Sequence, residues 1–266
     1  MGEPIAVFRE PRPLIRQVPV DRPWQWLAAG WRDLLETPRL SLACGLVPVL
    51  AGWLAAALLI WLDLPYLLVP LGAGFFFVGP FIAVGLYEIS RRRELGSTPG
   101  AEDVAYAWKR NPEQIAFMGM FFLLFHLAWM RVAQLLFALF DFRTVPSWDR
   151  FSEVVWYSSR SLPFLACGVV CGAVLAAIAF AVGAFAIPYL LDRRESNVFE
   201  AIATSVAAVK LNLQPMLLWA ALIVILTAFG MVPGLVGLAI TVPLVGHATW
   251  HAYRDVVVFR DGQGAG

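Results

Sequence analysis

Charged residues are scarce in this chain. Asp, Glu, Lys and Arg make up 15% of its 266 residues, and hydrophobic residues make up 60%. An ordinary soluble domain is about one quarter charged and about half apolar. The net charge is only +1, so no overall field attracts nucleic acid, and we expect none as a partner. The shortage of charge leaves long apolar runs that a soluble core could not bury.

Cysteine, histidine and catalytic motifs are also in short supply. The three cysteines, Cys44, Cys167 and Cys171, all lie in apolar runs, which excludes a disulfide framework. Cys167 and Cys171 share one helix face, so a thiolate metal site is the alternative to small apolar packing residues. The sequence shows no carboxylate cluster, Ser/His/Asp set or phosphate loop. We therefore expect no cofactor and lean against an enzyme.

The N-terminal segment lacks a cleavable signal. Residues 1–23 carry four arginines but no apolar core, whereas a signal peptide needs roughly 7–15 apolar residues before a small-residue site. We expect residues 1–23 to form a cytoplasmic arm, and the first long apolar run to stay in the membrane as a helix.

Long apolar runs occupy most of the remaining chain. A bilayer core about 30 Å thick needs roughly 20 apolar residues in a helix. We predict an all-α polytopic transmembrane helix bundle over residues 24–258, with amphipathic interfacial helices between three hairpins, and a flexible tail over 259–266. The predicted spans are residues 40–62, 64–87, 114–140, 162–191, 216–232 and 235–254.

The last two spans come from one long run that Pro233 and its neighbouring glycines interrupt. Proline removes a backbone donor and glycine permits a tight turn, so we split the run, with one kinked helix and five spans as the alternative. Lys and Arg mark the cytoplasmic side of short loops. Sixteen of the 20 basic residues fall on one side only if there are six spans. We therefore predict a multi-pass protein of a bacterial inner membrane with both termini cytoplasmic.

A weak internal repeat accompanies these spans. A shift of 101 residues superposes residues 92–94 on 193–195, and Lys109 and Asn111 on Lys210 and Asn212. Each copy has a span ending in a basic pair, an amphipathic segment, and a new span after a proline. Residues 24–35 offer a fainter third copy. The sequence therefore favours three similar hairpin units, with chance similarity among basic loops as the alternative.

Three strings carry a resemblance to a known family. GWRDLLETPRLSL (30–42), AGFFFVGPFIAVGLYEISRRRE (73–94) and GHATWHAYRD (246–255) resemble the bacterial family of predicted integral membrane proteins called domain of unknown function 2189. The resemblance covers roughly residues 26–258. It implies a membrane protein but no accepted active site, although some members are labelled as cytochrome c oxidase subunits.

The histidines test that label. A haem–copper oxidase core needs about six histidines, and this chain has three: His126, His247 and His251. It cannot be that subunit, although two axial ligands would suffice for a single haem. His247 and His251 have metal-ligand spacing on one helix face, with interfacial polar residues as the plainer interpretation. His126 and His247 fall at similar depth, so they could pair or make separate interhelical hydrogen bonds.

Three other polar residues lie in or beside the spans. Arg131 and Gln134 fall near the outer end of the third span, where Arg131 can snorkel to the headgroups or form an ion pair. Glu88 lies at the inner end of the second span beside Arg91 and Arg92, so we expect a local ion pair.

These observations favour a non-enzymatic accessory or scaffold protein that acts through contacts with membrane lipid, a second copy of itself or another membrane protein. A small transporter or channel is the alternative, because repeats and proline-broken helices are common in transporters. A redox or haem accessory protein is the second alternative and rests on the three histidines alone.

Overall fold

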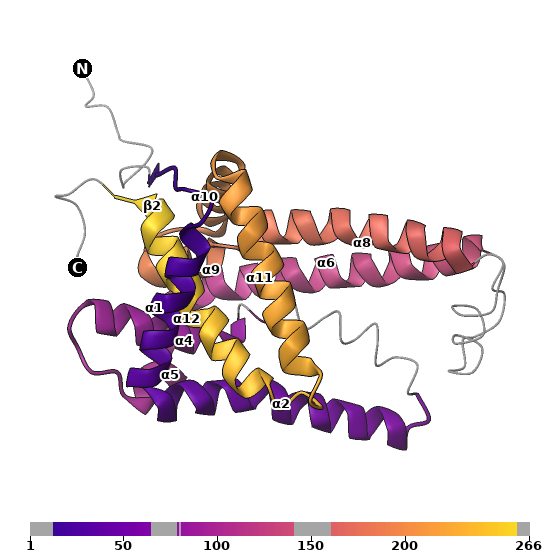
Figure 1. Cartoon of the computed structure of the whole chain (residues 1–266), viewed down its shortest axis with the longest axis horizontal. Coiled ribbons are helices and arrows are strands. Elements are labelled where there is room, and N and C mark those ends of the chain that lie inside the picture. The colour runs from indigo at the N-terminus through magenta and orange to yellow at the C-terminus, as the bar shows by residue number, and fades with distance from the viewer. Residues whose placement is uncertain (1–12, 65–78, 80, 141–160, 260–266) are drawn as a thin grey trace.

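The computed structural model of the protein describes residues 13–64, 79, 81–140 and 161–259. Within these ranges most of the chain is helical, and two short strands form one antiparallel ribbon (Figure 1). The predicted all-α membrane helix bundle is therefore confirmed.

Four helical segments among the described residues are long and apolar enough to cross a membrane. They are Pro38–Trp61 (α2), Pro112–Leu136 within α6 (Pro112–Leu139), Ser161–Asp192 (α8, Ser161–Gly183, and α9, Ala186–Asp192) and Leu213–Met231 (α11). α2 and α6 each begin at a proline, because the first helical turn needs no backbone donor.

The remaining two predicted spans are not among these four segments. Most of the span at 64–87 lies outside the described residues, which resume at its inner end with α4 (Val84–Glu94). The span at 235–254 coincides with α12 (Leu238–Val256), which is a helix but is not one of the four long apolar segments. The number of membrane crossings therefore stays a prediction.

The predicted run at 162–191 is not one continuous helix. The Ser205 hydroxyl donates to the carbonyl of Ala181 (2.8 Å) and accepts from the backbone N–H of Phe185 (3.1 Å). Pro188 follows within a turn and cannot donate. A side chain inserted into the helical ladder explains a break between α8 and α9, and hydropathy alone gives no sign of it.

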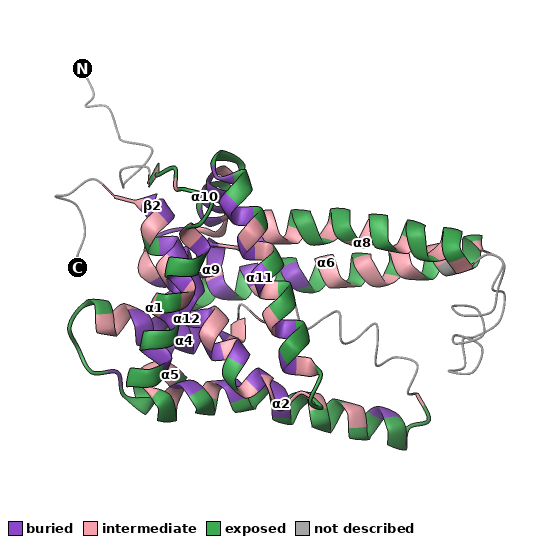
Figure 2. Cartoon of the chain, in the orientation of Figure 1, coloured by how far each residue is buried: buried purple, intermediate pink, exposed green. Residues whose placement is uncertain are grey.

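Three helices meet at one end of the molecule. α4, α9 and α12 each contact the other two, and Leu86, Leu190 and Trp250 are fully buried there. Figure 2 shows the buried residues gathered over this part of the fold, while α6 and α8 are mostly exposed or half-buried. The central core therefore lies at this end and not between the long apolar helices.

Each helix of this core carries an outer helix. α1 (Arg22–Glu36) packs on α12, α10 (Val198–Leu211) packs on α9, and α5 (Ala101–Ala105) with the 3-10 helix η2 (Ala107–Arg110) packs on α4. The two predicted amphipathic segments are thus helical, although the first is broken and the second continuous. The internal repeat itself stays a prediction.

The two ends of the described chain lie together. β1 (Leu14–Ile15) pairs antiparallel with β2 (Val257–Val258). Asn212 holds the next residues, because its side chain accepts from the N–H of Val18 (2.9 Å) and donates to the carbonyl of Arg16 (3.0 Å). Residues 14–18 of the predicted arm are therefore fixed against the core.

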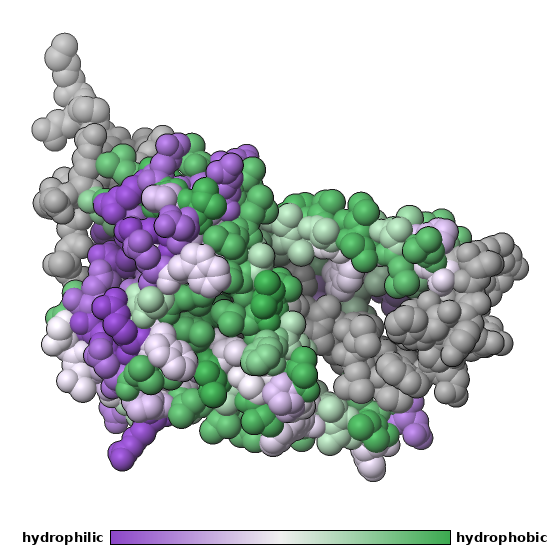
Figure 3. Space-filling view, in the orientation of Figure 1, coloured by the Kyte–Doolittle hydropathy of each residue, from purple (hydrophilic) through white to green (hydrophobic). Residues whose placement is uncertain are grey.

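On the face that Figure 3 shows, hydrophilic residues gather at the end that carries α1, β2 and the end of α12, and apolar residues predominate among the other coloured residues. We call this hydrophilic region the polar end. The division matches a membrane protein whose apolar part faces hydrocarbon and whose polar end faces headgroups and water.

Candidate functional site: a basic groove between α1 and α12

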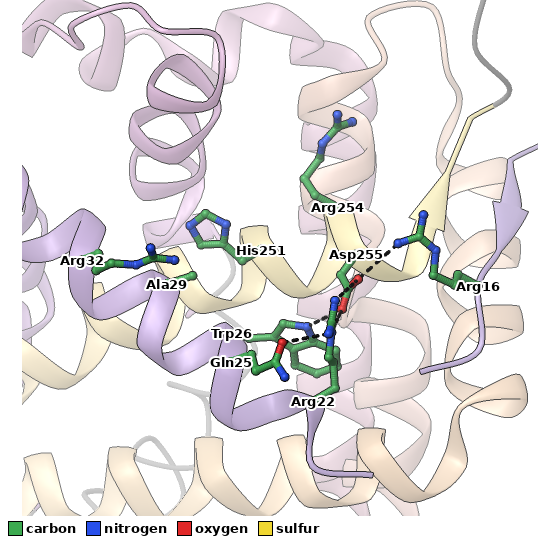
Figure 4. Close-up of a pocket in the computed structure, with 9 residues that line it drawn as sticks. All are labelled: Arg16, Arg22, Gln25, Trp26, Ala29, Arg32, His251, Arg254 and Asp255. Carbon is green, nitrogen blue, oxygen red and sulfur yellow. Dashed lines mark hydrogen bonds and ion pairs between the residues drawn. The ribbon is translucent and has the colours of Figure 1, made fainter. Parts of the chain in front are cut away.

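A hollow of about 340 Å³ lies at the polar end, between α1, α12 and the residue that follows β1 (Figure 4). We call it the basic groove. It is lined by Arg16, Arg22, Gln25, Trp26, Ala29, Arg32, His251, Arg254 and Asp255.

Helical periodicity brings the lining together. On α1, Arg22, Gln25, Ala29 and Arg32 follow one another at intervals of three and four residues, so they share one face. Another face of α1 packs on α12, where a Cβ at Gly30 would lie 2.6 Å from the backbone nitrogen of Ala248. The absence of that Cβ lets the two backbones approach closely, which sets the groove's walls side by side.

Asp255 is the anchor of the groove. Its carboxylate accepts hydrogen bonds from Arg22 Nε (2.6 Å) and Trp26 Nε1 (3.0 Å), and Arg16 lies 3.4 Å from it. Burial by itself would raise the pKa of Asp255, but the hydrogen bonds from Arg22 and Trp26 outweigh it and hold the pKa below its usual value. Asp255 is therefore ionised at neutral pH and fixes two of the four arginines.

The groove keeps an excess of positive charge. Four arginines line it against the single carboxylate of Asp255. Arg254 pairs outside the lining, with Glu94 (2.9 Å) and Asp192 (3.3 Å). Arg32 is exposed and makes no ion pair with any residue that the structure describes. The groove can therefore accept an anion, and Arg32 and Arg16 are the cations most available to it.

A buried hydrogen-bonded chain supports the groove from below. His251 Nε2 lies 2.8 Å from Asp33 Oδ2, and the Ser90 hydroxyl donates to the same oxygen (2.6 Å). His247 bridges Ser90, at 2.8 Å from Nδ1, and Ser41, at 2.9 Å from Nε2. The chain joins α1, α2, α4 and α12 and reaches the groove at His251.

The proton positions in this chain follow from its donors. Ser90 has one proton and gives it to Asp33, so Ser90 must accept from His247 Nδ1–H. In the neutral ring His247 Nε2 is then an acceptor, and the Ser41 hydroxyl lies 2.9 Å from it. Both ring nitrogens of the fully buried His247 are thus occupied.

Asp33 supplies the negative charge of this hydrogen-bonded network. Burial by itself would raise the pKa of Asp33, but hydrogen bonds from His251 and Ser90 prevail and lower it. Arg93 also lies 3.0 Å from Asp33 Oδ1. The ionised carboxylate therefore organises α1, α4 and α12 around one buried charge.

The three histidines of the sequence analysis have different surroundings. His251 lines the groove, His247 lies beneath it, and His126 lies on α6, outside this network. The structure joins His247 to two serines and not to His126. Among the described residues no three potential ligands converge as a metal site.

The other predicted polar residues take up local partners. Arg91 makes two 2.7 Å hydrogen bonds to Glu88, and Arg92 makes one of 2.9 Å, so the expected ion pair is present. Burial would raise the pKa of Glu88, but these hydrogen bonds and charges lower it. Arg131 donates to Gln134 (3.0 Å) on the exposed face of α6.

Sequence reasoning did not find the groove. Its residues come from positions 16, 22–32 and 251–255, and no pairing between the chain's two ends is visible in the sequence. The three-and-four spacing of Arg22, Gln25, Ala29 and Arg32 was a usable signal, because it places two arginines on one helix face next to Trp24 and Trp31.

Comparison with known proteins supports the membrane assignment. Residues 68–192 match the model of the family described as "Predicted integral membrane protein (DUF2189)". The resemblance predicted from the sequence is thereby confirmed over that stretch. No curated protein and no solved structure matches the chain.

Proposed function

Since its residues 68–192 belong to this family of integral membrane proteins, we propose that the chain is a non-enzymatic membrane protein that binds an anionic phospholipid headgroup in the basic groove. It would serve as an accessory or scaffold protein held in the cytoplasmic leaflet of a bacterial inner membrane. The proposal combines a membrane protein with a cationic site at its polar end.

The groove's charge is the observation that carries the proposal. Arg22 and Arg32 of α1 and Arg16 of the chain after β1 line one hollow, and the carboxylate of Asp255 holds Arg16 and Arg22 in place. Arg254 of α12 points away, toward Glu94 and Asp192. A phosphodiester offers the oxygen acceptors that guanidinium groups bind with strong, charge-assisted hydrogen bonds. Arg32 and Arg16 lie at opposite ends of the groove (Figure 4), so each would make such contacts at its own end.

The surroundings of the groove favour a lipid over a soluble phosphate. α1 also exposes a stripe of apolar residues, Trp24, Trp31 and Leu35, each more than 40% exposed. Tryptophan is enriched at the level of the headgroups, where its ring and its N–H find suitable surroundings. A helix that presents this stripe beside a basic face would lie in the interface with its groove at headgroup depth.

The packing of the polar end gives less support to the two alternatives. Phe185, Trp250 and Tyr253 fill the junction of α9 and α12 without exposed surface, which is unlike the lining of a transport path. The ring nitrogens of His247 are both occupied by serines, which is unlike a haem ligand. The transporter therefore rests on the repeat and the proline-broken helices, and the redox protein on the three histidines.

Lipid-dependent thermal unfolding tests the proposal. Purified full-length protein is delipidated and mixed with micelles containing either phosphatidylglycerol or phosphatidylcholine. We expect a higher unfolding midpoint with phosphatidylglycerol, because a ligand that binds only the folded state stabilises it by about 2.7 kcal/mol at 100 times its Kd. The difference should shrink with added salt, which screens exposed charges.

Two variants show whether the groove is responsible. The double variant Arg16→Gln, Arg32→Gln should lose most of the phosphatidylglycerol effect. Arg194→Gln changes an exposed arginine outside the groove, removes one positive charge and should keep the effect. Glycerol phosphate in solution provides the soluble arm. Equal midpoints in both lipids, an equal loss in Arg194→Gln, or full stabilisation by glycerol phosphate would contradict the proposal.

A further inference from the structure

We propose that α11 and α12 form a re-entrant hairpin, which enters the membrane from the polar end and turns back before it reaches the far side. The turn, residues 232–237, would lie within the hydrocarbon. This inference rests on the C-terminal hairpin and is independent of the basic groove. It replaces the last two predicted full spans with one partial insertion and keeps both ends of the hairpin on the same side.

The composition of the turn suits hydrocarbon. Residues 228–240 contain no charged or polar side chain. Val232 and Phe229 are 83% and 75% exposed, and Val236 is exposed as well. In contrast, α2 ends next to Asp63. A turn at a water-facing surface would place large apolar side chains in water, whereas a turn inside the bilayer needs this composition.

Contacts with α2 set the depth of the turn. Two glycines of α2 lie against the hairpin: Gly45 packs against the backbone of Ala239, and Gly52 packs against the side chain of Leu235. Further along α2, the indole N–H of Trp53 donates a hydrogen bond to the carbonyl of Gly234 (2.7 Å). α2 continues from Trp53 to Trp61, which adds about 12 Å at 1.5 Å per residue. Figure 1 shows the turn lying against α2 short of its far end. If α2 spans the bilayer, the turn lies inside it.

The polar atoms of the turn are largely satisfied within the protein. Backbone N–H groups of Leu235, Val236 and Leu238 donate to carbonyls of Met231, Pro233 and Leu235. Pro233 has no N–H to satisfy, and the carbonyl of Gly234 accepts a hydrogen bond from the indole N–H of Trp53. Irregular backbone is tolerated at membrane depth only where such partners replace water. The same bond also satisfies the indole N–H of Trp53, which lies within the apolar helix α2.

Glycines make the hairpin close at this point. A Cβ on Gly237 would lie 2.8 Å from Gly230 Cα, and a Cβ on Gly230 would lie 2.3 Å from the Thr241 hydroxyl. The helices therefore meet backbone to backbone just before the turn. Gly234 has φ 63°, in the left-handed region that glycine adopts without strain.

The preceding hairpin provides an internal comparison. α6 has 28 residues and α11 has 19, and both follow a buried asparagine, Asn111 or Asn212. The difference of nine residues corresponds to about 13 Å of helix. The returning segments differ in the same direction, because residues 161–192 form 32 residues of near-continuous helix and α12 has 19. The last hairpin is therefore built shorter in both of its helices.

Cysteine labelling in sealed proteoliposomes tests the proposal. In full-length protein with Cys44, Cys167 and Cys171 replaced by alanine, single cysteines are introduced as Val232→Cys, Asp63→Cys and Ser97→Cys. Ser97 lies in the exposed loop after α4. A membrane-impermeant maleimide is supplied outside or inside the vesicles. We expect Asp63→Cys and Ser97→Cys to react from opposite sides, and Val232→Cys to react from neither side until detergent is added.

Depth is measured independently with a fluorophore on the same cysteine. Lipids that carry a spin label near the middle of the acyl chain should quench it more than lipids labelled at the headgroup. Val236→Cys serves as a second position should Val232→Cys fail to fold. Impermeant labelling of Val232→Cys from the side of Asp63 would indicate a full crossing, and labelling from the side of Ser97 would indicate no insertion. Reaction of Asp63→Cys and Ser97→Cys from the same side would show that α2 does not cross the bilayer as assumed, so the depth of the turn could not be read from α2. Each of these three outcomes overturns the proposal.

Discussion

The polar end and the long apolar helices differ in which residues they bury. At the polar end, Asp33, Glu88 and His247 are buried among partners, and aromatic side chains fill the spaces between helices. Along α2, α6 and α8, large apolar side chains such as Leu54, Leu139 and Leu162 are more than 70% exposed. The most apolar helices are thus the least buried.

The contrast follows from the solvent that each region meets. Lipid tails are as apolar as leucine, so helices in the membrane gain little by burying leucine against one another. At the polar end water is present, so apolar burial stabilises the fold and buried charges need partners. Substitutions at the polar end should therefore cost more than matched substitutions in the apolar helices.

The largest difference is expected for buried charge. Glu88→Ala leaves Arg91 without its carboxylate in a region where Glu88 is 2% exposed, whereas Arg92 keeps Asp103 at 2.7 Å. Breaking a buried ion pair in this way costs about 3–5 kcal/mol. Arg131→Ala removes an exposed hydrogen bond to Gln134 on α6 and should change stability by about 0.5 kcal/mol or less. Chemical unfolding of both variants in detergent measures the difference, and equal losses would show that the two regions are alike.

Close helix packing should give the next largest effect. Gly30→Ala forces a methyl group to within 2.6 Å of Ala248 backbone nitrogen, and overpacking of this kind costs about 1–3 kcal/mol. Gly168→Ala on α8 meets no described atom within 4 Å and should be neutral or slightly stabilising. Thermal unfolding compares the pair. A larger loss at Gly168 would mean that α8 packs against a partner at this position.

An effect of the same order is expected from a matched pair of serines at the polar end. Ser90→Ala removes the hydroxyl that joins Asp33 to His247 and should cost about 1–3 kcal/mol, because buried groups lose their partner. Ser97→Ala removes an exposed hydrogen bond to the carbonyl of Arg92 and should cost about 0.5 kcal/mol or less. Unfolding measured side by side separates them, and similar losses would contradict a buried network around His247.

The smallest effect within the usual pH range concerns acid stability. Asp33, Glu88 and Asp255 all have lowered pKa values in the folded protein. Their contribution is therefore complete above the unfolded values near 4 and is lost as pH falls through the lower folded values. Unfolding midpoints should be flat from about pH 8 to pH 5 and fall below about pH 4. In Asp255→Asn that acid-dependent fall should be shallower, and an unchanged fall would indicate that Asp255 contributes nothing to it.

Hydropathy, proline and charge placement predicted much of the architecture. The runs behind α2, α6, α8 and α11 are helices as predicted, and the interruption at Pro233 separates α11 from α12. The ion pair of Glu88 also followed from its neighbours in sequence. These features depend on residues close together in the chain, where periodicity and backbone chemistry are informative.

The candidate site could not be predicted in the same way. The groove joins residue 16 to residue 255, and the buried chain joins Asp33, Ser90 and His247. Single polar residues of this kind carry no spacing pattern, and nothing in the sequence distinguishes a histidine held by two serines from one that binds a metal.

That this chain belongs in a membrane follows from its composition, because runs of apolar residues as long as a bilayer is thick have no other stable place. Which apolar run reaches how far, and which polar residues meet, depends on tertiary packing. Gly30 and Gly45 admit α12 against α1 and α2, and Trp53 takes the carbonyl of the turn at Gly234. Such contacts join distant segments, so their energies enter only when the helices are assembled, and no local pattern in the chain records them.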